Sequence, residues 1–365
     1  MSFLKNIFKI KEKPVQSNED FWKWFRKNEK KFHKVIKQKD KVEKDFLDQL
    51  LPKLNELKDG FFLLTGMYDD NTAELIITAD GNVINFVFVE ELVRSAPEIV
   101  GWKFTALKHA HDIKDSSITM AGYDFNTENL NFYSNDSAEY PDEIDITVVH
   151  DDFNEENETE IINGTNIFLD YYLGELDFVL TVDNLKFIGK NDNEKELIPI
   201  EKLKDFLNWR QKEFIEKYEG VRYDTENDNY SGLEAELESG NALIAIVNTE
   251  LLRWDSKASH PWVSILTLKY DGTLNNGMPN DDDYQLLNTI EELIMLQLKD
   301  IDGYLNIGRQ TAEGDREIFF ACKDFRKPSQ IFFNIQKDYS SNFEIEYDIY
   351  KDKYWQTFNR FIPAL

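Results

Sequence analysis

The stretch FEIEYDIY, residues 343–350, is the most clearly patterned segment of the chain. Apolar or aromatic side chains alternate there with acidic ones: Phe343, Ile345, Tyr347 and Ile349 alternate with Glu344, Glu346 and Asp348. A period of two is typical of a strand that buries one face and exposes the other. The segment therefore predicts a sheet near the C-terminus with one buried face and one acidic, solvated face.

The segments before this strand extend a pattern of short strands and amphipathic helices back to about residue 241. Gly, Pro, Asn and Asp, which are typical turn residues, separate them. The second half is predicted to contain strands over 241–249, 261–270, 303–310, 315–322 and 343–350. Helices are predicted over 281–298, 328–338 and 353–361, which gives the order ββαββαβα.

The first half begins with two helices rich in basic side chains, over about 18–38 and 41–58. Ser17 and Asp20 have the spacing of a capping box, and Gly60 is a stop signal. The elements expected next are a hairpin over 61–79, a helix over 83–95, strands over 101–108, 117–125, 129–134 and 143–150, a helix from about 161, a strand over 177–188 and a helix over 200–219.

These patterns predict an α+β protein of two domains, each with a mainly antiparallel sheet and helices packed on one face. Without its leading helices and one hairpin, the first half has the order ββαββαβα of the second, which suggests a duplicated unit. Residues 220–232 have few aliphatic side chains and many turn formers. The predicted organisation is a flexible or amphipathic tail (1–16), an N-terminal domain (17–219), a linker (220–232) and a C-terminal domain (233–365).

Charge is distributed unevenly along the 365 residues, whose formal net charge is -27. The first 60 residues carry a net charge of +6 and the remainder carries -33. Binding a nucleic-acid backbone needs clustered Lys and Arg, so we do not expect a nucleic-acid partner. The acidity fits either plain solubility or an electronegative face that meets a basic protein partner.

The N-terminal segment Met1–Lys13 has an apolar helical face surrounded by lysines. It contains no uninterrupted apolar region of the kind a secretory signal needs, so we expect a cytoplasmic protein. The segment could lie on an anionic membrane surface or form a frayed or docked tail. No run approaches the roughly 18 apolar residues of a membrane-spanning helix, so integral membrane contact is not expected.

Several polar clusters could carry chemistry, but each has a simpler explanation. His109, His111 and Asp112 could hold a metal or form a polar loop. Asp224, Glu226 and Asp228 have the rhythm of a calcium loop, yet the glycine and the last glutamate of that motif are missing. Residues 281–283, all Asp, could hold a divalent cation or cap a helix. The single cysteine, Cys322, fits a buried thiol.

Nucleotide-binding, dinucleotide-binding and hydrolase motifs are absent from the sequence. We therefore predict no cofactor, no metal and no catalytic residues, and the sequence favours a protein that is not an enzyme.

The hairpin at residues 308–317, GRQTAEGDRE, is the most suggestive polar cluster. Strand alternation could bring Arg309 and Thr311 together, and the turn could bring Arg316 or Glu317 close to them. In a chain short of positive charge, two arginines near one turn could bind an anion or a carboxylate. They could equally neutralise neighbouring acids.

Several short motifs of the second half resemble an uncharacterised bacterial family, domain of unknown function six-nine-five. The resemblance covers about residues 235–361 and rests on Pro261-Trp262, Lys269-Tyr270, Gly277-Met278-Pro279, the hairpin with Arg309, Thr311, Gly314, Arg316 and Glu317, and Glu346-Tyr347-Asp348. In the first half, Phe21-Trp22-x-Trp24-Phe25 and the segment from Ala96 to Ala106 look like a region of related hypothetical proteins. The family implies no established activity, although similar domains are sometimes joined to one like the protein inhibitor of ribonuclease E.

The favoured function is a non-catalytic acidic protein, regulatory or of the immunity type, that binds a basic protein partner. The alternative is a module that binds or hydrolyses a small anion at Arg309, Thr311 and Arg316. The sequence identifies neither the partner nor the oligomeric state.

Overall fold

The computed structural model describes residues 13–114, 116–192 and 195–362. Almost all of the predicted amphipathic segment Met1–Lys13 lies outside these residues. The chain divides into two compact units, Met1–Lys108 and His109–Leu365, called here the N-terminal and C-terminal units. The predicted division around a linker at 220–232 stays a prediction, and each unit is described by itself.

The N-terminal unit begins with the predicted basic helices. Helix α1 spans Asn18–Gln38, and the Ser17 side chain accepts a hydrogen bond from the Asp20 backbone N–H at 3.2 Å. The second predicted helix is a π-helical turn, η1 (Glu43–Leu47), followed by α2 (Asp48–Asn55). The capping signal in the sequence therefore marks the true start of α1.

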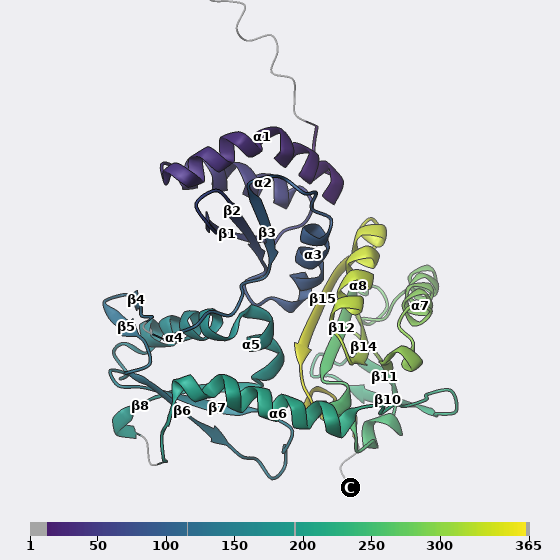
Figure 1. Ribbon diagram of the computed structural model, residues 1–365. Coiled ribbons are helices and arrows are strands. Elements are labelled where there is room, and N and C mark those ends of the chain that lie inside the picture. The colour runs from purple at the N-terminus through teal and green to yellow at the C-terminus, as the bar shows by residue number, and fades with distance from the viewer. Residues whose placement is uncertain (1–12, 115, 193–194, 363–365) are drawn as a thin grey trace, which may run out of the picture. The chain divides into compact units, whose positions relative to one another are not determined.

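A three-stranded sheet completes the N-terminal unit. Strand β1 (Phe62–Met67) pairs antiparallel with β2 (Ala73–Thr78), and β3 (Trp102–Ala106) pairs parallel with β2 after helix α3 (Val83–Arg94). Figure 1 shows α1 and α2 on one face of this sheet. The core between them is largely aromatic and contains Phe21, Trp22, Phe25, Phe32, Phe46 and Trp102.

The C-terminal unit contains a four-stranded sheet in its first part, in the order β8-β7-β6-β9. A short hairpin, β4–β5, precedes it where one strand over 117–125 was predicted. The strands are β4 (Ile118–Met120), β5 (Tyr123–Phe125), β6 (Leu130–Asn135), β7 (Asp145–His150), β8 (Asn184–Gly189) and β9 (Ile198–Pro199). Helices α4 (Glu158–Leu173) and α6 (Leu203–Tyr218) share one hydrophobic core with this sheet.

The prediction of a single strand over 177–188 is wrong. Residues Glu175–Thr181 form a short helix, α5, and only Asn184–Gly189 form a strand. A short apolar run such as Phe178 to Leu180 fits a buried helix as well as a strand, so periodicity does not separate them. Gly174, with a positive φ of 83°, forms the junction between α4 and α5.

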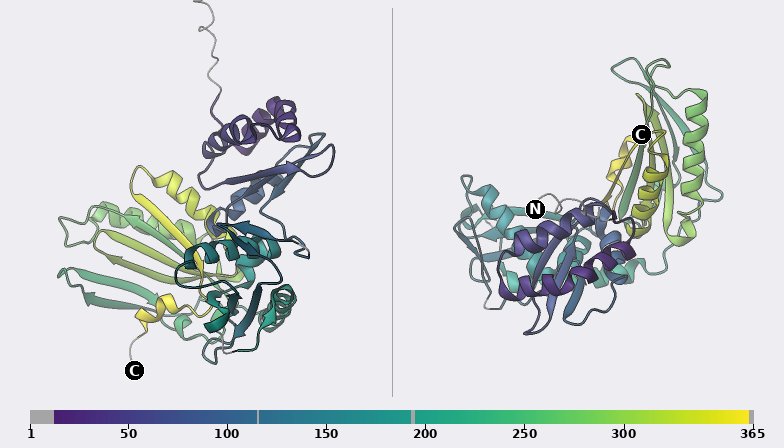
Figure 2. Two further views of the ribbon diagram at one scale, coloured as in Figure 1. Left: turned by 90° about the vertical axis from the view of Figure 1, so that its left-hand side faces the viewer. Right: turned by 90° about the horizontal axis from the view of Figure 1, so that it is seen from above.

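A six-stranded antiparallel sheet dominates the rest of the C-terminal unit, in the order β10-β11-β13-β14-β12-β15. Its strands are β10 (Tyr230–Glu236), β11 (Ala242–Asn248), β12 (Trp262–Lys269), β13 (Tyr304–Ala312), β14 (Asp315–Cys322) and β15 (Glu344–Lys351). Helices α7 (Asp281–Met295) and α8 (Arg326–Tyr339) lie on one face of it (Figure 2). Trp355, Phe358 and Phe361 pack against the other face.

Strand β15 has the predicted alternation: Ile345 and Ile349 are buried, whereas Glu344, Glu346 and Asp348 are exposed. The α+β class and the mainly antiparallel sheets are confirmed. The final predicted helix is instead a 3-10 helix, η7 (Gln356–Phe361).

The two halves do not repeat one arrangement. Strand β10, which begins inside the predicted linker, gives the second half the order βββαββαβ in place of ββαββαβα. The strands of the first half are divided among three sheets, whereas those of the second half form one. Among the described residues, no helix has both the length and the apolar character needed to cross a membrane.

Candidate functional site

The hairpin singled out in the sequence is β13–β14, and its register places Thr311 opposite Arg316 and Gln310 opposite Glu317. Arg316 and Arg309 both contact side chains of α7, so these residues lie on the face that the helices cover. Glu317 lies on the other face, 3.6 Å from Arg360. The structure therefore brings Arg309, Thr311 and Arg316 together and separates Glu317 from them.

The two arginines are engaged by neighbouring side chains. The buried Arg316 side chain donates from Nε to Thr311 Oγ1 at 3.1 Å and from Nη1 to Asn288 Oδ1 at 2.8 Å. Arg309 forms an ion pair of 2.6 Å with Glu291, which is also buried. Burial, followed by the charge of Arg309, lowers the pKa of Arg316. These contacts explain both arginines structurally, and a ligand-binding role for them stays a prediction.

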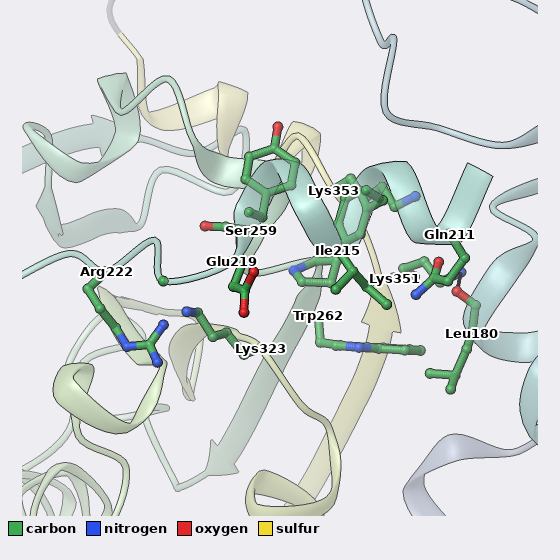
Figure 3. Close-up of a pocket in the computed structure, with 14 residues that line it drawn as sticks. Leu180, Gln211, Ile215, Glu219, Arg222, Ser259, Trp262, Lys323, Lys351 and Lys353 are labelled. Atoms are coloured by element: carbon green, nitrogen blue, oxygen red, sulfur yellow. Dashed lines mark hydrogen bonds between the residues drawn. The ribbon is translucent and has the colours of Figure 1, made fainter. Parts of the chain in front are cut away.

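A second cluster of cations lies elsewhere in the C-terminal unit, in a cavity of about 370 Å³ (Figure 3). Side chains from α6, from the segment after it, and from the ends of β12, β14 and β15 line this cavity, called here the basic cleft. The residues that line it are Leu180, Gln211, Phe214, Ile215, Tyr218, Glu219, Gly220, Arg222, Ser259, Pro261, Trp262, Lys323, Lys351 and Lys353.

Arg222 and Lys323 form the charged end of the basic cleft. Arg222 Nη1 and Lys323 Nζ both donate a hydrogen bond to the carbonyl oxygen of Val221, at 2.8 and 2.5 Å. Figure 3 shows the two side chains directed toward one another. No carboxylate of the described residues lies within 4.0 Å of either cation. Two positive charges are therefore held side by side with no carboxylate in ion-pair contact, although the whole chain is strongly acidic.

The two other lysines of the cleft share one close carboxylate, Asp183, and Glu143 adds a second negative charge at longer range. Lys353 Nζ lies 2.6 Å from Asp183 Oδ2 and donates to the Asp142 carbonyl at 2.7 Å. Lys351 Nζ lies 3.1 Å from the other oxygen of Asp183 and donates to the Leu180 and Val182 carbonyls. Because two carboxylates, Asp183 and Glu143, face these two lysines, Lys351 and Lys353 add little to the uncompensated charge.

The pKa shifts near Arg222 and Lys323 have the sign expected for excess positive charge. Burial lowers the pKa of Lys323, and the charge of Arg222 lowers it further. Burial, with Lys323 and Arg222 as smaller causes, lowers the pKa of His260 to about 3. A negative ion between the two cations would oppose these shifts because it favours the protonated forms.

Most of the remaining cleft surface is apolar. Trp262, the first residue of β12, lies on one side of the cavity, and Ile215 of α6 lies on the other (Figure 3). Phe214 of α6 also lines the cavity. Ile215 is 55 % exposed, although it is an aliphatic side chain. Figure 3 shows Leu180 and Gln211 at the end opposite to Arg222.

Sheet register explains why residues distant in sequence meet here. Trp262 pairs with Cys322 on β14 and with Lys351 on β15, so Trp262, Lys323 and Lys351 lie at the same edge of the sheet. Sequence patterns do not reveal this site, because Arg222 lies in the predicted linker and Lys323 follows a strand without any motif. Only the strand order and register, which a single sequence does not show, bring them together.

The other candidates from the sequence have structural roles. The His111 ring stacks on Tyr171, with centroids 4.3 Å apart, and in the described ranges no three metal-ligating side chains gather as a possible metal site. Asp228 accepts hydrogen bonds from Tyr223 and Asn248. Asn280 caps α7 by accepting from the Asp283 N–H. Cys322 is fully buried, and burial raises its pKa to about 12.

Comparison with known proteins gives one match. Residues 231–362 match the model of a family described as Family of unknown function (DUF695). This match covers about the C-terminal third of the chain. The match confirms the resemblance seen in the motifs, and the DUF695 segment coincides with the six-stranded sheet and its helices. No curated protein and no solved structure matches the chain.

The DUF695 segment supplies only part of the basic cleft. Ser259, Pro261, Trp262, Lys323, Lys351 and Lys353 belong to it, whereas Arg222 and the lining residues of α6 precede it. The cleft is therefore a property of the whole C-terminal unit.

Proposed function

We propose that the C-terminal unit is a non-catalytic binding module that takes a small anionic molecule in the basic cleft. The observation that supports this most directly is the pair of cations, Arg222 and Lys323, that share one carbonyl oxygen and have no carboxylate partner in the described part of the chain. A concave site of several hundred Å³ with a few convergent polar groups is typical of small-molecule binding.

An anion is the ligand that this arrangement favours. Two like charges that lie near one another repel, and an anion between them replaces that repulsion by two attractions. Arg presents a planar fork of donors that suits carboxylate or phosphate oxygens, and Lys adds a compact point charge. Both side chains have further N–H donors beyond the one that each directs at Val221.

The polar groups nearest to the charged end do not form a nucleophilic pair. Ser259 Oγ donates to the Ser256 carbonyl at 2.7 Å, so its proton is not directed at a base. His260 Nδ1 lies 2.8 Å from the same Oγ and must therefore act as the donor in that contact. The His260 ring is fully buried. A serine whose proton points away from its histidine favours binding over hydrolysis.

Calorimetric titration of the full chain with inorganic phosphate and with acetate tests this proposal. We expect saturable binding in the millimolar range, which is ordinary for ions without further contacts. The double substitution Arg222→Gln and Lys323→Gln should weaken binding at least tenfold. The matched control is Arg309→Gln, which removes a guanidinium that already pairs with Glu291. Binding that is absent from the wild type, or equal in the double variant, would overturn the proposal.

The hypothesis of a basic protein partner rests on the net charge and stays a prediction. It is supported by the exposed carboxylates of the edge strand β15, although Lys269 pairs with Glu344 and Glu346, each at 2.9 Å. Affinity capture from a lysate at low and high salt tests it, because contacts between exposed charges weaken with salt. A stoichiometric basic protein that is lost at high salt is the expected result. The cytoplasmic location also stays a prediction.

A further inference from the structure

We infer that the ligand of the basic cleft is an amphipathic carboxylate, with one anionic head at Arg222 and Lys323 and an apolar body between α6 and Trp262. This inference rests on the proposed function, because it names the class of molecule that the same site takes. Three features of the cleft lead to it, namely where its free charge lies, how large that charge is, and what covers the remaining surface.

The free positive charge is confined to one end. Lys351 and Lys353 also line the cavity, but Asp183 and, at longer range, Glu143 offset their charges, and backbone carbonyls accept hydrogen bonds from both. The side chains of Arg222 and Lys323 donate only to Val221 in the described structure. A ligand with charges at both ends would leave its second charge near lysines whose charges are offset and near apolar side chains, where desolvation is unfavourable.

The size of this charge favours a single negative charge on the head. Glu219 lines the cleft and is exposed, and Figure 3 shows its carboxylate on the side of the cavity where Lys323 lies. It forms no ion pair within 4.0 Å with either cation, so it does not occupy the site between them. The charged side chains that line this end, two cations and the carboxylate of Glu219, sum to about +1, which matches a carboxylate better than a phosphate dianion.

The middle and far end of the cleft suit an apolar body. Ile215, Phe214 and Pro261 line the cavity with Trp262 and Leu180. Ile215 is an aliphatic residue that is 55 % exposed. A ligand that removes it from water lowers the free energy of the complex. At roughly 30 Å³ for each water-sized group, the volume of about 370 Å³ holds a body of moderate length.

A homologous series of carboxylates tests the inference: acetate, butyrate, hexanoate and octanoate are titrated into the full chain. If each added CH₂ is buried, the dissociation constant should fall about three- to fourfold per CH₂ until the cavity is full. Ile215→Gln should weaken octanoate binding about three- to tenfold and leave acetate binding unchanged. Leu296→Gln is the matched control, because Leu296 is 67 % exposed and does not line the cleft.

The substitution Glu219→Gln tests how the Glu219 carboxylate affects anion affinity. Glu219→Gln should tighten the binding of all these anions and should tighten the binding of inorganic phosphate more than that of acetate, because the lost repulsion grows with ligand charge.

Equal affinity for acetate and octanoate, with both lost in the Arg222→Gln, Lys323→Gln double variant, would overturn the amphipathic ligand and leave the anion site standing. Absence of binding for every anion would overturn the proposed function itself. Octanoate binding that is unaffected by the double variant would place the ligand elsewhere and overturn both.

Discussion

The ammonium of Lys353 lies 2.6 Å from the carboxylate of Asp183, and the two residues flank strands of different sheets in the C-terminal unit. Asp183 precedes β8 of the four-stranded sheet, whereas Lys353 follows β15 of the six-stranded sheet. Both side chains are buried, with 3 % and 6 % of their surfaces exposed. Lys351 reaches the other oxygen of the same carboxylate. One carboxylate thus holds two lysines of the DUF695 segment against the part of the chain that precedes it.

Asp183→Asn should therefore destabilise the C-terminal unit strongly. It leaves two buried ammonium groups without their counter-charge, and breaking a buried ion pair in this way typically lowers the free energy of unfolding by about 3–5 kcal/mol. Urea denaturation measures the change. Asp302→Asn is the control, since Asp302 forms an exposed pair of 3.3 Å with Lys327 and should change stability by less than about 1 kcal/mol. Similar small effects of both substitutions would contradict the buried arrangement.

The buried His260 should make the protein sensitive to mild acid. Its pKa is about 3 in the folded protein, well below the ordinary value of 6.5, so the unfolded chain binds more protons between these pH values. The contribution of His260 to the free energy of unfolding is therefore fully present above pH 6.5, and it is lost as the pH falls toward 3. Between pH 7 and pH 5 the contribution of this residue is about 2 kcal/mol. His260→Gln should lose less stability than the wild type over that interval, as measured by urea denaturation at both pH values. An equal loss in both proteins would exclude His260 as the cause.

Gly164→Ala should destabilise the protein although alanine is the better helix former. A Cβ on Gly164, in the middle of α4, would lie 2.0 Å from Cζ of Phe125. The gain in helix propensity is about 1 kcal/mol, whereas overpacking typically costs about 1–3 kcal/mol. We expect a net loss of about 1 kcal/mol in the free energy of unfolding. Asn163→Ala, at the exposed neighbouring position, should be neutral or slightly stabilising. A stabilised Gly164→Ala variant would contradict the close contact between α4 and β5.

The substitution Arg316→Gln tests whether Arg316 of the hairpin stabilises the fold or binds a ligand. The substitution removes donors to the buried Thr311 and the half-buried Asn288, and leaving a buried polar group unpaired costs about 1–3 kcal/mol. We expect a lower midpoint in thermal denaturation with an unchanged dissociation constant for acetate. A normal midpoint combined with lost anion binding would instead support the site that the sequence suggested.

Local patterns predicted the elements whose causes are local. The Ser17 cap, the alternation in β15 and the turn at Gly314 depend on neighbouring residues and were readable from the sequence. The segment 177–188 was misread because an apolar run of that length is compatible with a helix or a strand. The joining of the two sheets by Asp183 and the convergence of Arg222 and Lys323 depend on contacts between distant residues. No pattern within one segment encodes such contacts, so the basic cleft could not be predicted.

The origin of the two walls of the basic cleft bears on how recognition changes in evolution. Trp262 and Lys323 come from the DUF695 segment, whereas Ile215 and Arg222 come from the chain that precedes it. A protein that joined the same sheet to a different preceding helix would keep half of the binding surface and replace the other half. Ligand preference could then diverge without any change in the sheet, because only the residues of the preceding helix would differ. In such proteins, the residues that determine ligand specificity would lie in the chain just before the DUF695 segment.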